Sequence, residues 1–243
     1  MKHFTKIAAL GLTAVCLTGC LAACAKNPNA ETKNTDPAKA EQRQEEDLIN
    51  DKGMMTGGWT AAKSNAVTEQ QMKYFREAVA LINGYFYEPV ALVGTQVVSG
   101  VNYCFLCKTT VDQQNGVGTL KYTYIYVNTE GDARFMGDKN VTIPGSSVTQ
   151  KLGGYSYASN PEITADIQKI VDKAAAKRLG TEYTPIAYLG SQVVAGKNHA
   201  ILCRTTPVTA DPNAAGSLVI VTIYEDLQGN CEITGTTNVS LNF

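Results

Sequence analysis

The chain has 243 residues, with 21 Lys and Arg against 22 Asp and Glu and a net charge of −1 at pH 7. This balance, without a basic stripe, excludes an electrostatic footprint for nucleic acid, so we expect no nucleic-acid partner. An apolar content of 44% is ordinary for a globular chain. The roughly 190 residues left after a leader and a polar segment allow one large or two small domains.

The first 24 residues are typical of an export signal. Two basic residues precede an apolar run that is too short and too weakly flanked for a transmembrane helix. The run closes on "LTGC" and "LAAC", and both phrases resemble the lipobox of bacterial lipoproteins. We therefore expect residues 1–24 to be a signal peptide ending at a lipidated Cys24, with Cys20 as the alternative. A plain secretory signal or an uncleaved anchor is the competing interpretation.

Residues 25–55 are rich in Asn, Lys, Glu, Ala and Pro and offer almost nothing to bury. Such a composition cannot offset the entropy of ordering the backbone, so this segment is expected to be a flexible tether. A cysteine that carries several acyl chains holds a protein stably on a membrane. The expected localisation is therefore an exported, cell-surface, membrane-anchored lipoprotein.

The remaining chain contains an internal repeat. "YEPVALVGTQVVSGVN" from Tyr87 recurs as "YTPIAYLGSQVVAGKN" from Tyr183, and "LCKTT" recurs as "LCRTT", both at an offset of 96 residues. Further along, Tyr126 aligns with Tyr224 at an offset of 98. We predict two homologous modules, residues 56–143 and 152–243, joined by a linker over residues 144–151 that is marked by Gly and Ser.

Each module is expected to begin with a helix. In the first module, Ser64 or Thr68 is the candidate cap, and Gly84 ends an apolar stripe with helical spacing. In the second module, Asn160 followed by Pro161 is the start signal and Gly180 the end. The stripes consist of Met72, Phe75, Val79 and Ile82 in the first module and of Ile163, Ile167, Ile170 and Ala174 in the second.

Four β-rich runs separated by turn residues follow each helix. In the first module they are "YEPVALVGT", "NYCFLCKTTV", "TLKYTYIYV" and "DARFMGDKNVTI". A helix followed by strands in hairpin succession predicts an antiparallel β-meander packed on one helix, which places the chain in the α+β class. Because each copy has its own helix and strands, the modules are expected to fold separately.

The repeated phrase, "QVVSG" at residues 96–100 and "QVVAG" at residues 192–196, lies between two expected strands. Its two adjacent valines cannot both be buried by one face of a sheet, because consecutive strand residues point in opposite directions. At least one valine is then expected to project into solvent, which is typical of a contact surface. In the alternative interpretation, the valines simply end the strand and the turn comes at Gly100 and Gly196.

These residues resemble the cystatin family. The resemblance covers each module along its length and is carried by "GGW…QVVSGVNY" and "GGY…QVVAGKNH". It implies a cystatin-like fold and a wedge that plugs the active-site cleft of papain-like cysteine proteases, a partner reached through a few preorganised apolar anchors. The residues that it assigns to protease binding are Gly57, Gly58, Gln96, Val97, Val98, Ser99 and Gly100 in the first module, and Gly153, Gly154, Gln192, Val193, Val194, Ala195 and Gly196 in the second.

The second hairpin of the cystatin wedge departs from the family pattern. Where Pro-Trp would stand, the chain has Asn128-Thr129 in the first module and Asp226-Leu227 in the second. Losing a buried tryptophan anchor is expected to weaken binding by a few kcal/mol. Leu227 is an apolar substitute and is therefore included among the protease-binding residues. Trp59, the only tryptophan, either serves as an anchor or packs on its own sheet.

The sequence gives little support for an enzyme. Outside the leader the cysteines are Cys104, Cys107, Cys203 and Cys231, which we expect to be free and mostly buried thiols. The one histidine there, His199, lies four residues from Cys203 on a strand, about 13 Å away and out of hydrogen-bond reach. No metal-ligand spacing or phosphate loop is present, so we expect no catalytic residue, no metal and no cofactor.

Two functions follow from the residues and the resemblance. One is a surface-tethered, reversible inhibitor of papain-like cysteine proteases that acts as a monomer. The other is a non-inhibitory, protein-binding or adhesive surface lipoprotein that uses the same fold. The repeated motif favours the first function and the missing Pro-Trp favours the second.

Overall fold

The computed structural model describes residues 57–111, 118–146, 154–209 and 216–242. The first five strands form one antiparallel sheet in chain order: β1 (Trp59–Ala61), β2 (Tyr85–Val98), β3 (Gly100–Val111), β4 (Thr119–Val127) and β5 (Ala133–Asn140). The other five form a second sheet in the same way: β6 (Ser156–Tyr157), β7 (Thr181–Val194), β8 (Gly196–Pro207), β9 (Ser217–Glu225) and β10 (Cys231–Asn238). Helix α2 (Glu69–Val79) precedes β2, and helix α3 (Ala165–Ala175) precedes β7.

The α+β class predicted from the sequence, with two tandem cystatin-like modules, is wrong. The described residues are mostly antiparallel β, ten strands in two sheets, and contain only two helices of 11 residues each. This is not a clear α+β layout of the cystatin type. The physical reason is that each helix covers only one face of its sheet, whereas both faces of each sheet bury side chains.

Several sequence predictions lie outside the described residues. These are the signal peptide 1–24 with Cys20 and Cys24, the tether 25–55, residues 147–151 of the linker, and Gly153. They stay predictions. Among the described residues, no helix is long and apolar enough to cross a membrane.

Both helices begin at a threonine cap. Thr68 accepts a hydrogen bond from the backbone N–H of Gln71, whose side chain in turn accepts one from the N–H of Thr68. Such a capping box satisfies two N–H groups that the first helical turn leaves unpaired. Thr164 caps α3 through the N–H of Ile167. The cap of the second helix thus lies four residues after the predicted Asn160.

The long strands β2 and β7 carry the same two irregularities. Their pairing with β3 and β8 shifts register between Pro89 and Ala91 and again between Leu92 and Gly94, and the equivalent shifts occur in β7. A bulge places two residues opposite one and bends the strand, and it tolerates a proline that cannot donate to the ladder. Each long strand therefore curves while it continues into the hairpin.

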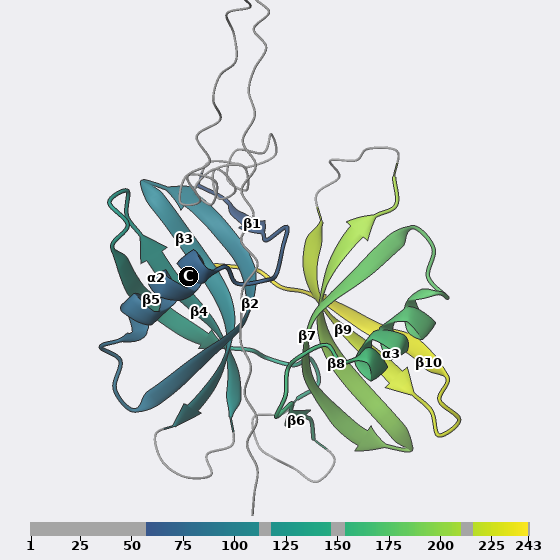
Figure 1. Cartoon of the computed structure of the whole chain (residues 1–243). Coiled ribbons are helices and arrows are strands. Elements are labelled where there is room, and N and C mark those ends of the chain that lie inside the picture. The colour runs from purple at the N-terminus through teal and green to yellow at the C-terminus, as the bar shows by residue number, and fades with distance from the viewer. Residues whose placement is uncertain (1–56, 112–117, 147–153, 210–215, 243) are drawn as a thin grey trace, which may run out of the picture. The chain divides into compact units, whose positions relative to one another are not determined.

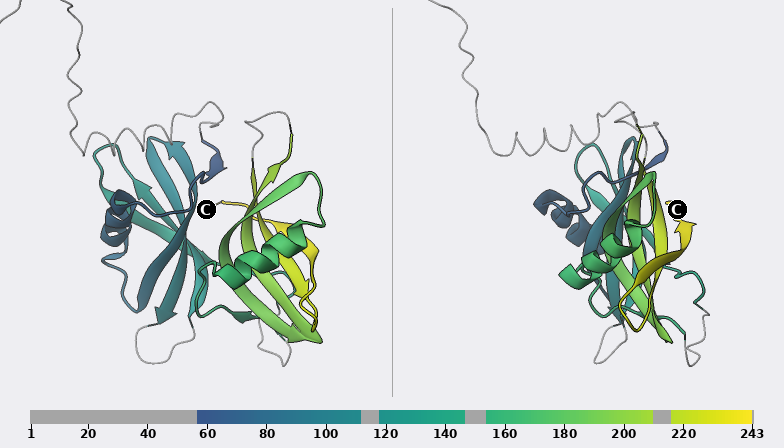
Figure 2. Two further views of the ribbon diagram at one scale, coloured as in Figure 1. Left: turned by 45° about the vertical axis from the view of Figure 1, so that its right-hand side comes forward. Right: turned by 90° about the vertical axis from the view of Figure 1, so that its right-hand side faces the viewer.

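Each sheet buries side chains on both faces. Odd-numbered residues of β3, such as Phe105 and Cys107, pack in one cluster with Phe75 and Ala78 of α2. Even-numbered residues such as Leu106 belong to a second cluster that also contains Leu202 and Ile220 of the second sheet. A third cluster joins α3 to the other face of the second sheet. Figure 2 shows α2 in blue over the first sheet and α3 in green over the second.

The cluster that contains residues of both sheets, which we call the shared core, explains why β dominates the structure. It consists of Ala91, Val93, Cys104, Leu106, Leu120, Tyr122, Tyr124, Val141, Ile143, Ile186, Ala187, Leu189, Ala200, Leu202, Leu218, Ile220 and Leu241. All described residues lie within one compact unit, Gln42–Phe243. The helix-free face of each sheet is therefore apolar because the other sheet covers it.

Candidate functional site

The repeated phrase forms the end of a hairpin in both sheets. Val98 pairs with Gly100 across Ser99, and Val194 pairs with Gly196 across Ala195. The valines thus end the strand, as the alternative interpretation holds, and the turn follows them. We call Gln96–Gly100 the first tip and Gln192–Gly196 the second tip.

The valines are nevertheless exposed. Val98 is 40% exposed and Val194, at the equivalent position, is 42% exposed, while Val193 reaches 72%. Val97 is half-buried. Each tip therefore offers an apolar side chain to solvent at the same place, next to a turn residue that is also exposed.

A glycine is required at each tip. Gly100 has φ 113° and Gly196 has φ 120°, a backbone conformation that other residues rarely adopt. A Cβ at Gly100 would lie 2.3 Å from the carbonyl oxygen of Val127, and one at Gly196 would lie 2.4 Å from that of Glu225. The glycine thus lets the tip lie against the end of the neighbouring strand.

A tyrosine from the neighbouring strand holds each tip. The hydroxyl of Tyr126 donates to the carbonyl oxygen of Ser99, and the hydroxyl of Tyr224 donates to that of Ala195. The Arg134 guanidinium lies over the Tyr126 ring, 4.8 Å from its centroid. The sequence shows these tyrosines as a repeated pair, but their role was missed because only the structure shows which carbonyl they reach. The bonds preorganise the tips.

The glutamine of the motif is a bridge within the protein. Gln96 donates through Nε2 to the carbonyl oxygen of Gly57 at 2.8 Å and accepts through Oε1 from Asn102 at 2.7 Å. At the second tip, Asn198 donates to Oε1 of Gln192 at 2.9 Å. The Gln96 side chain thus joins the first hairpin to the segment before it, and the predicted role of both glutamines in protease binding stays a prediction.

The N-terminal glycines lie beside the first tip. The N–H of Gly57, which has φ 84°, donates to the carbonyl oxygen of Val97 at 3.1 Å, and Gly58 leads directly into β1. Trp59 of β1 pairs with Gln96. In the second repeat, Ser156 of β6 pairs with Ser191, which places the half-buried Gly154 on the approach to the second tip.

The turn that follows the neighbouring strand completes each site. In the first repeat, Asn128 accepts hydrogen bonds through Oδ1 from the N–H groups of Glu130 and Asp132. Asp226 does the same for Gln228 and Asn230. An Asx side chain that accepts from the backbone two residues on stabilises a tight turn, so Asn128 and Asp226 each fix the turn at which they stand.

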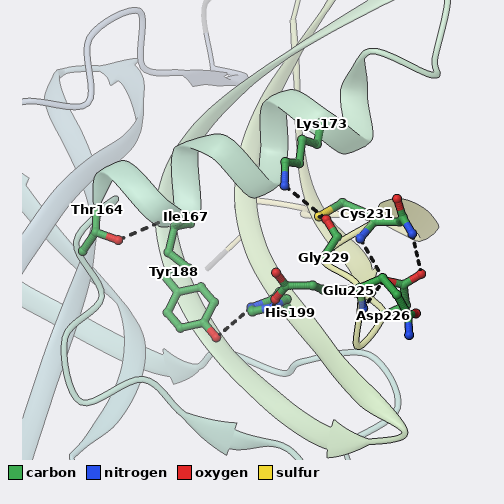
Figure 3. A network of polar contacts seen from close by, with 11 residues as sticks. Thr164, Ile167, Lys173, Tyr188, His199, Glu225, Asp226, Gly229 and Cys231 are labelled. Atoms are coloured by element: carbon green, nitrogen blue, oxygen red, sulfur yellow. Dashed lines mark hydrogen bonds and ion pairs between the residues drawn. The ribbon is translucent and has the colours of Figure 1, made fainter.

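Leu227 stands on this turn and is 80% exposed. Figure 3 shows Lys173 of α3 reaching the same turn, where its Nζ donates to the carbonyl oxygen of Gly229 at 3.1 Å. Hydrogen bonds from the side chain and backbone of Asn230 lower the pKa of Asp226, so the turn carries a negative charge at neutral pH. Thr129 at the equivalent place in the first repeat is exposed and polar.

Trp59 is not presented at the tip. Its ring packs edge-on against Tyr124 with centroids 5.4 Å apart, and it borders the shared core. The interpretation in which Trp59 packs on its own sheet is thus confirmed.

The four cysteines of the described residues are free and buried, which confirms the sequence prediction. Burial raises the pKa of Cys107 and of Cys203 to about 12 and also raises that of Cys104 and Cys231. A thiol with such a pKa is almost entirely protonated at neutral pH and is a poor nucleophile.

A polar trio of Tyr188, His199 and Glu225 (Figure 3) lies near the second tip, on the strands that form the hairpin and on the strand beside it. His199 is 3% exposed, with Nδ1 3.1 Å from the Tyr188 hydroxyl and Nε2 3.0 Å from Oε2 of Glu225. Burial lowers its pKa, although hydrogen bonding and the charge of Glu225 act against that shift. The trio was missed in the sequence because its members lie on three different strands.

The members of the trio, a phenol, an imidazole and a carboxylate, are hydrogen-bonded to one another. Among the described residues, no group of three or more His, Cys, Asp or Glu side chains is placed to hold a metal ion. The two sites share an exposed apolar tip that is held by hydrogen bonds and lies near a glycine and a tight turn.

No protein-family model matches the chain, and no curated protein matches it.

Proposed function

We propose that the protein is a surface-tethered, reversible inhibitor of papain-like cysteine proteases. The observation that carries the proposal is the exposed valine at the end of each rigid hairpin, Val98 and Val194. In each sheet, a short strand preceded by glycine and a tight turn lie at the same end as the hairpin tip. The proposal depends on this local geometry and on the motif, and not on the fold class.

The physical argument is that a narrow protease cleft favours a thin, preorganised, apolar insert. Because Tyr126 and Tyr224 already fix the tips, little conformational entropy is lost on binding. Each half-exposed valine adds about 1 kcal/mol when its remaining surface is buried. The hairpin turn passes the catalytic cysteine without presenting a scissile peptide bond, so the block is reversible.

The tether forms the second part of the proposal. A lipidated Cys24 would anchor the inhibitor in the membrane, and the polar segment 25–55 would link it to the rest of the protein at the cell surface. Intact-mass analysis of the membrane fraction tests this. Cys24→Ser is expected to release the protein, whereas a Cys24→Ser protein that stays lipidated and is released by Cys20→Ser would assign the anchor to Cys20.

The inhibition test uses papain and the Val98→Asp/Val194→Asp double variant. An aspartate buried without a partner in a cleft weakens binding by about 3–5 kcal/mol, which is at least a 100-fold loss of inhibition. The same aspartates stay solvated in the free protein, so the thermal midpoint is expected to change little. Leu81→Asp is the matched control, because Leu81 is 87% exposed and lies just beyond α2.

The alternative function is a non-inhibitory, protein-binding or adhesive surface lipoprotein. The exposed, polar Thr129 favours it, since the first site has no large apolar anchor on its turn. Wild-type protein with an intact thermal transition and no inhibition of papain would refute the protease proposal and support this alternative.

A further inference from the structure

The two sheets pack against each other with their hairpin tips at opposite ends. Arg204 lies on β8 at the end away from the second tip, and its Nη1 donates to the carbonyl oxygen of Ala62 at 2.7 Å. Ala62 directly follows β1, which pairs beside the first tip. The end of the second sheet that is remote from its own tip thus lies against the segment that directly follows β1.

The chain end makes the same kind of contact. Leu241 follows β10 at the end away from the turn of Asp226, and its Cδ1 lies 2.3 Å from where a Cβ on Gly94 would stand. Gly94 is only four residues before Val98. A side chain at residue 94 would therefore displace Leu241, and the glycine lets the two segments meet.

The reverse contact joins the other pair of ends. Tyr157 lies on β6, which pairs with β7 beside the second tip, and its hydroxyl donates to the carbonyl oxygen of Val141 at 2.6 Å. Val141 directly follows β5 at the end away from the first tip. In Figure 1, β1 and β6, which mark the two sites, accordingly lie at opposite ends of the paired sheets.

We propose that the two tips are separate sites that hold two papain-like proteases on one chain at the same time. This inference rests on the proposed function. The shared core holds the sheets together in their opposed orientation, so a partner at Val98 approaches from one end and a partner at Val194 from the other. A strand of 12 residues spans about 40 Å, which separates the tips by roughly the length of a sheet.

The opposed arrangement has a consequence that a side-by-side arrangement would not have. Tips that pointed the same way would bring two bulky proteases into collision, so occupation of one would exclude the other. Tips at opposite ends leave both open, and binding at one does not alter the affinity at the other. One chain then binds two proteases without cooperativity.

The test is the stoichiometry of the complex with papain whose catalytic cysteine is carboxymethylated, measured by native mass spectrometry with excess papain. Wild-type protein is expected to gain the mass of two proteases. Val98→Asp and Val194→Asp, which change equivalent residues of similar exposure, are each expected to gain one. The double variant is expected to gain none, and Leu81→Asp two.

The outcomes separate this inference from the function itself. Wild-type protein that gains only one protease while each single variant still gains one would mean that the tips exclude each other, which overturns the inference. A single variant that gains none would show only one working tip, which also overturns it but leaves inhibition standing. Wild-type protein that binds no papain would overturn the proposed function as well.

Discussion

Leu202→Ala, a change in the second repeat, is expected to destabilise the first repeat as well. Leu202 is fully buried, and its cluster contains residues of both sheets. Removing a buried leucine side chain lowers the free energy of unfolding by about 2–5 kcal/mol, because apolar contacts are lost and a cavity is left. For a unit of this size, about 3 kcal/mol lowers the thermal midpoint by roughly 6–12 °C.

Trp59 provides the assay. It is the only tryptophan of the chain, lies in the first sheet and borders the shared core. Its fluorescence therefore reports the unfolding of the first repeat, while far-UV circular dichroism reports both sheets. In Leu202→Ala, both signals are expected to shift to the same lower temperature.

Leu227→Ala is the matched control, because it makes the same chemical change at a residue that is 80% exposed. Its effect is expected to stay within about 0.5 kcal/mol. Separate folding of the modules, which the linker sequence predicts, would give the opposite result for Leu202→Ala. A circular dichroism transition that moves while the Trp59 midpoint stays fixed would refute the shared core as a cooperative unit.

Three further predictions concern the groups around the sites. Gly190→Ala would place a Cβ 2.2 Å from the carbonyl oxygen of Ser156, so β6 is expected to detach from β7 and the free energy of unfolding to fall by about 1–3 kcal/mol. A denaturant titration measures this loss. Gly235→Ala is the control, because its Cβ would meet nothing closer than 3.9 Å. Folding lowers the pKa of His199, so the stability that neutral His199 contributes is present above its ordinary pKa of about 6.5 and is lost as the pH falls below that value, with a slope of at most about 1.4 kcal/mol per pH unit. Thermal midpoints measured between pH 7.5 and 5 should show this loss. His199→Tyr, which copies Tyr103 of the first repeat, should remove the pH dependence. The four buried thiols should react with a thiol reagent at pH 8 only after unfolding, and fast labelling of any of them in native residues 25–243 would contradict their burial.

The local elements could be predicted where a single residue decides them. Thr68 was a candidate cap and is the cap, because a threonine followed by a glutamine at the third helical position satisfies two backbone groups. Asn160 was a wrong start, since its side chain accepts from the N–H of Glu162 and the carbonyl oxygen of Pro161 accepts from the N–H of Tyr188. Those bonds hold the segment against β7 as a loop, and Thr164 then begins the helix.

The fold class could have been read more accurately from the strands themselves. A strand that buries one face alternates between apolar and polar residues, whereas Tyr103 to Cys107 and Ala200 to Cys203 are nearly continuous apolar runs. Such runs indicate strands covered on both faces. One short helix covers only one face of a sheet, so another element must cover the second face. No local sequence pattern indicates that this element is the sheet of the other repeat.

The candidate sites were predictable as far as the motif reaches. The tip residues lie within a few positions of one another in sequence, so their place on a hairpin follows from strand and turn signals alone. The contacts that hold the tips are not local: Tyr126 is 27 residues from Ser99, and Tyr224 is 29 from Ala195. Their role depends on strand order, which the repeat alone does not fix.

The two repeats have diverged at the residues that face the helix side near the tip. In the first repeat, Leu92, Tyr103 and Val127 form an apolar cluster with α2. In the second repeat, the equivalent positions hold the polar trio of Tyr188, His199 and Glu225. A buried histidine that is hydrogen-bonded on both sides is stable only while its partners stay in place, so the trio fixes β7, β8 and β9 relative to one another.

This divergence bears on which tip binds more tightly. Glu225 belongs to the trio and directly precedes Asp226 and Leu227, so the turn that carries Leu227 is anchored on its inner side by His199. Lys173 holds the same turn from the helix. An exposed leucine on a turn fixed from two sides loses little entropy when it is buried, whereas Thr129 offers no comparable apolar surface. The second tip is therefore the stronger of the two proposed sites, and its advantage should shrink when His199 is protonated.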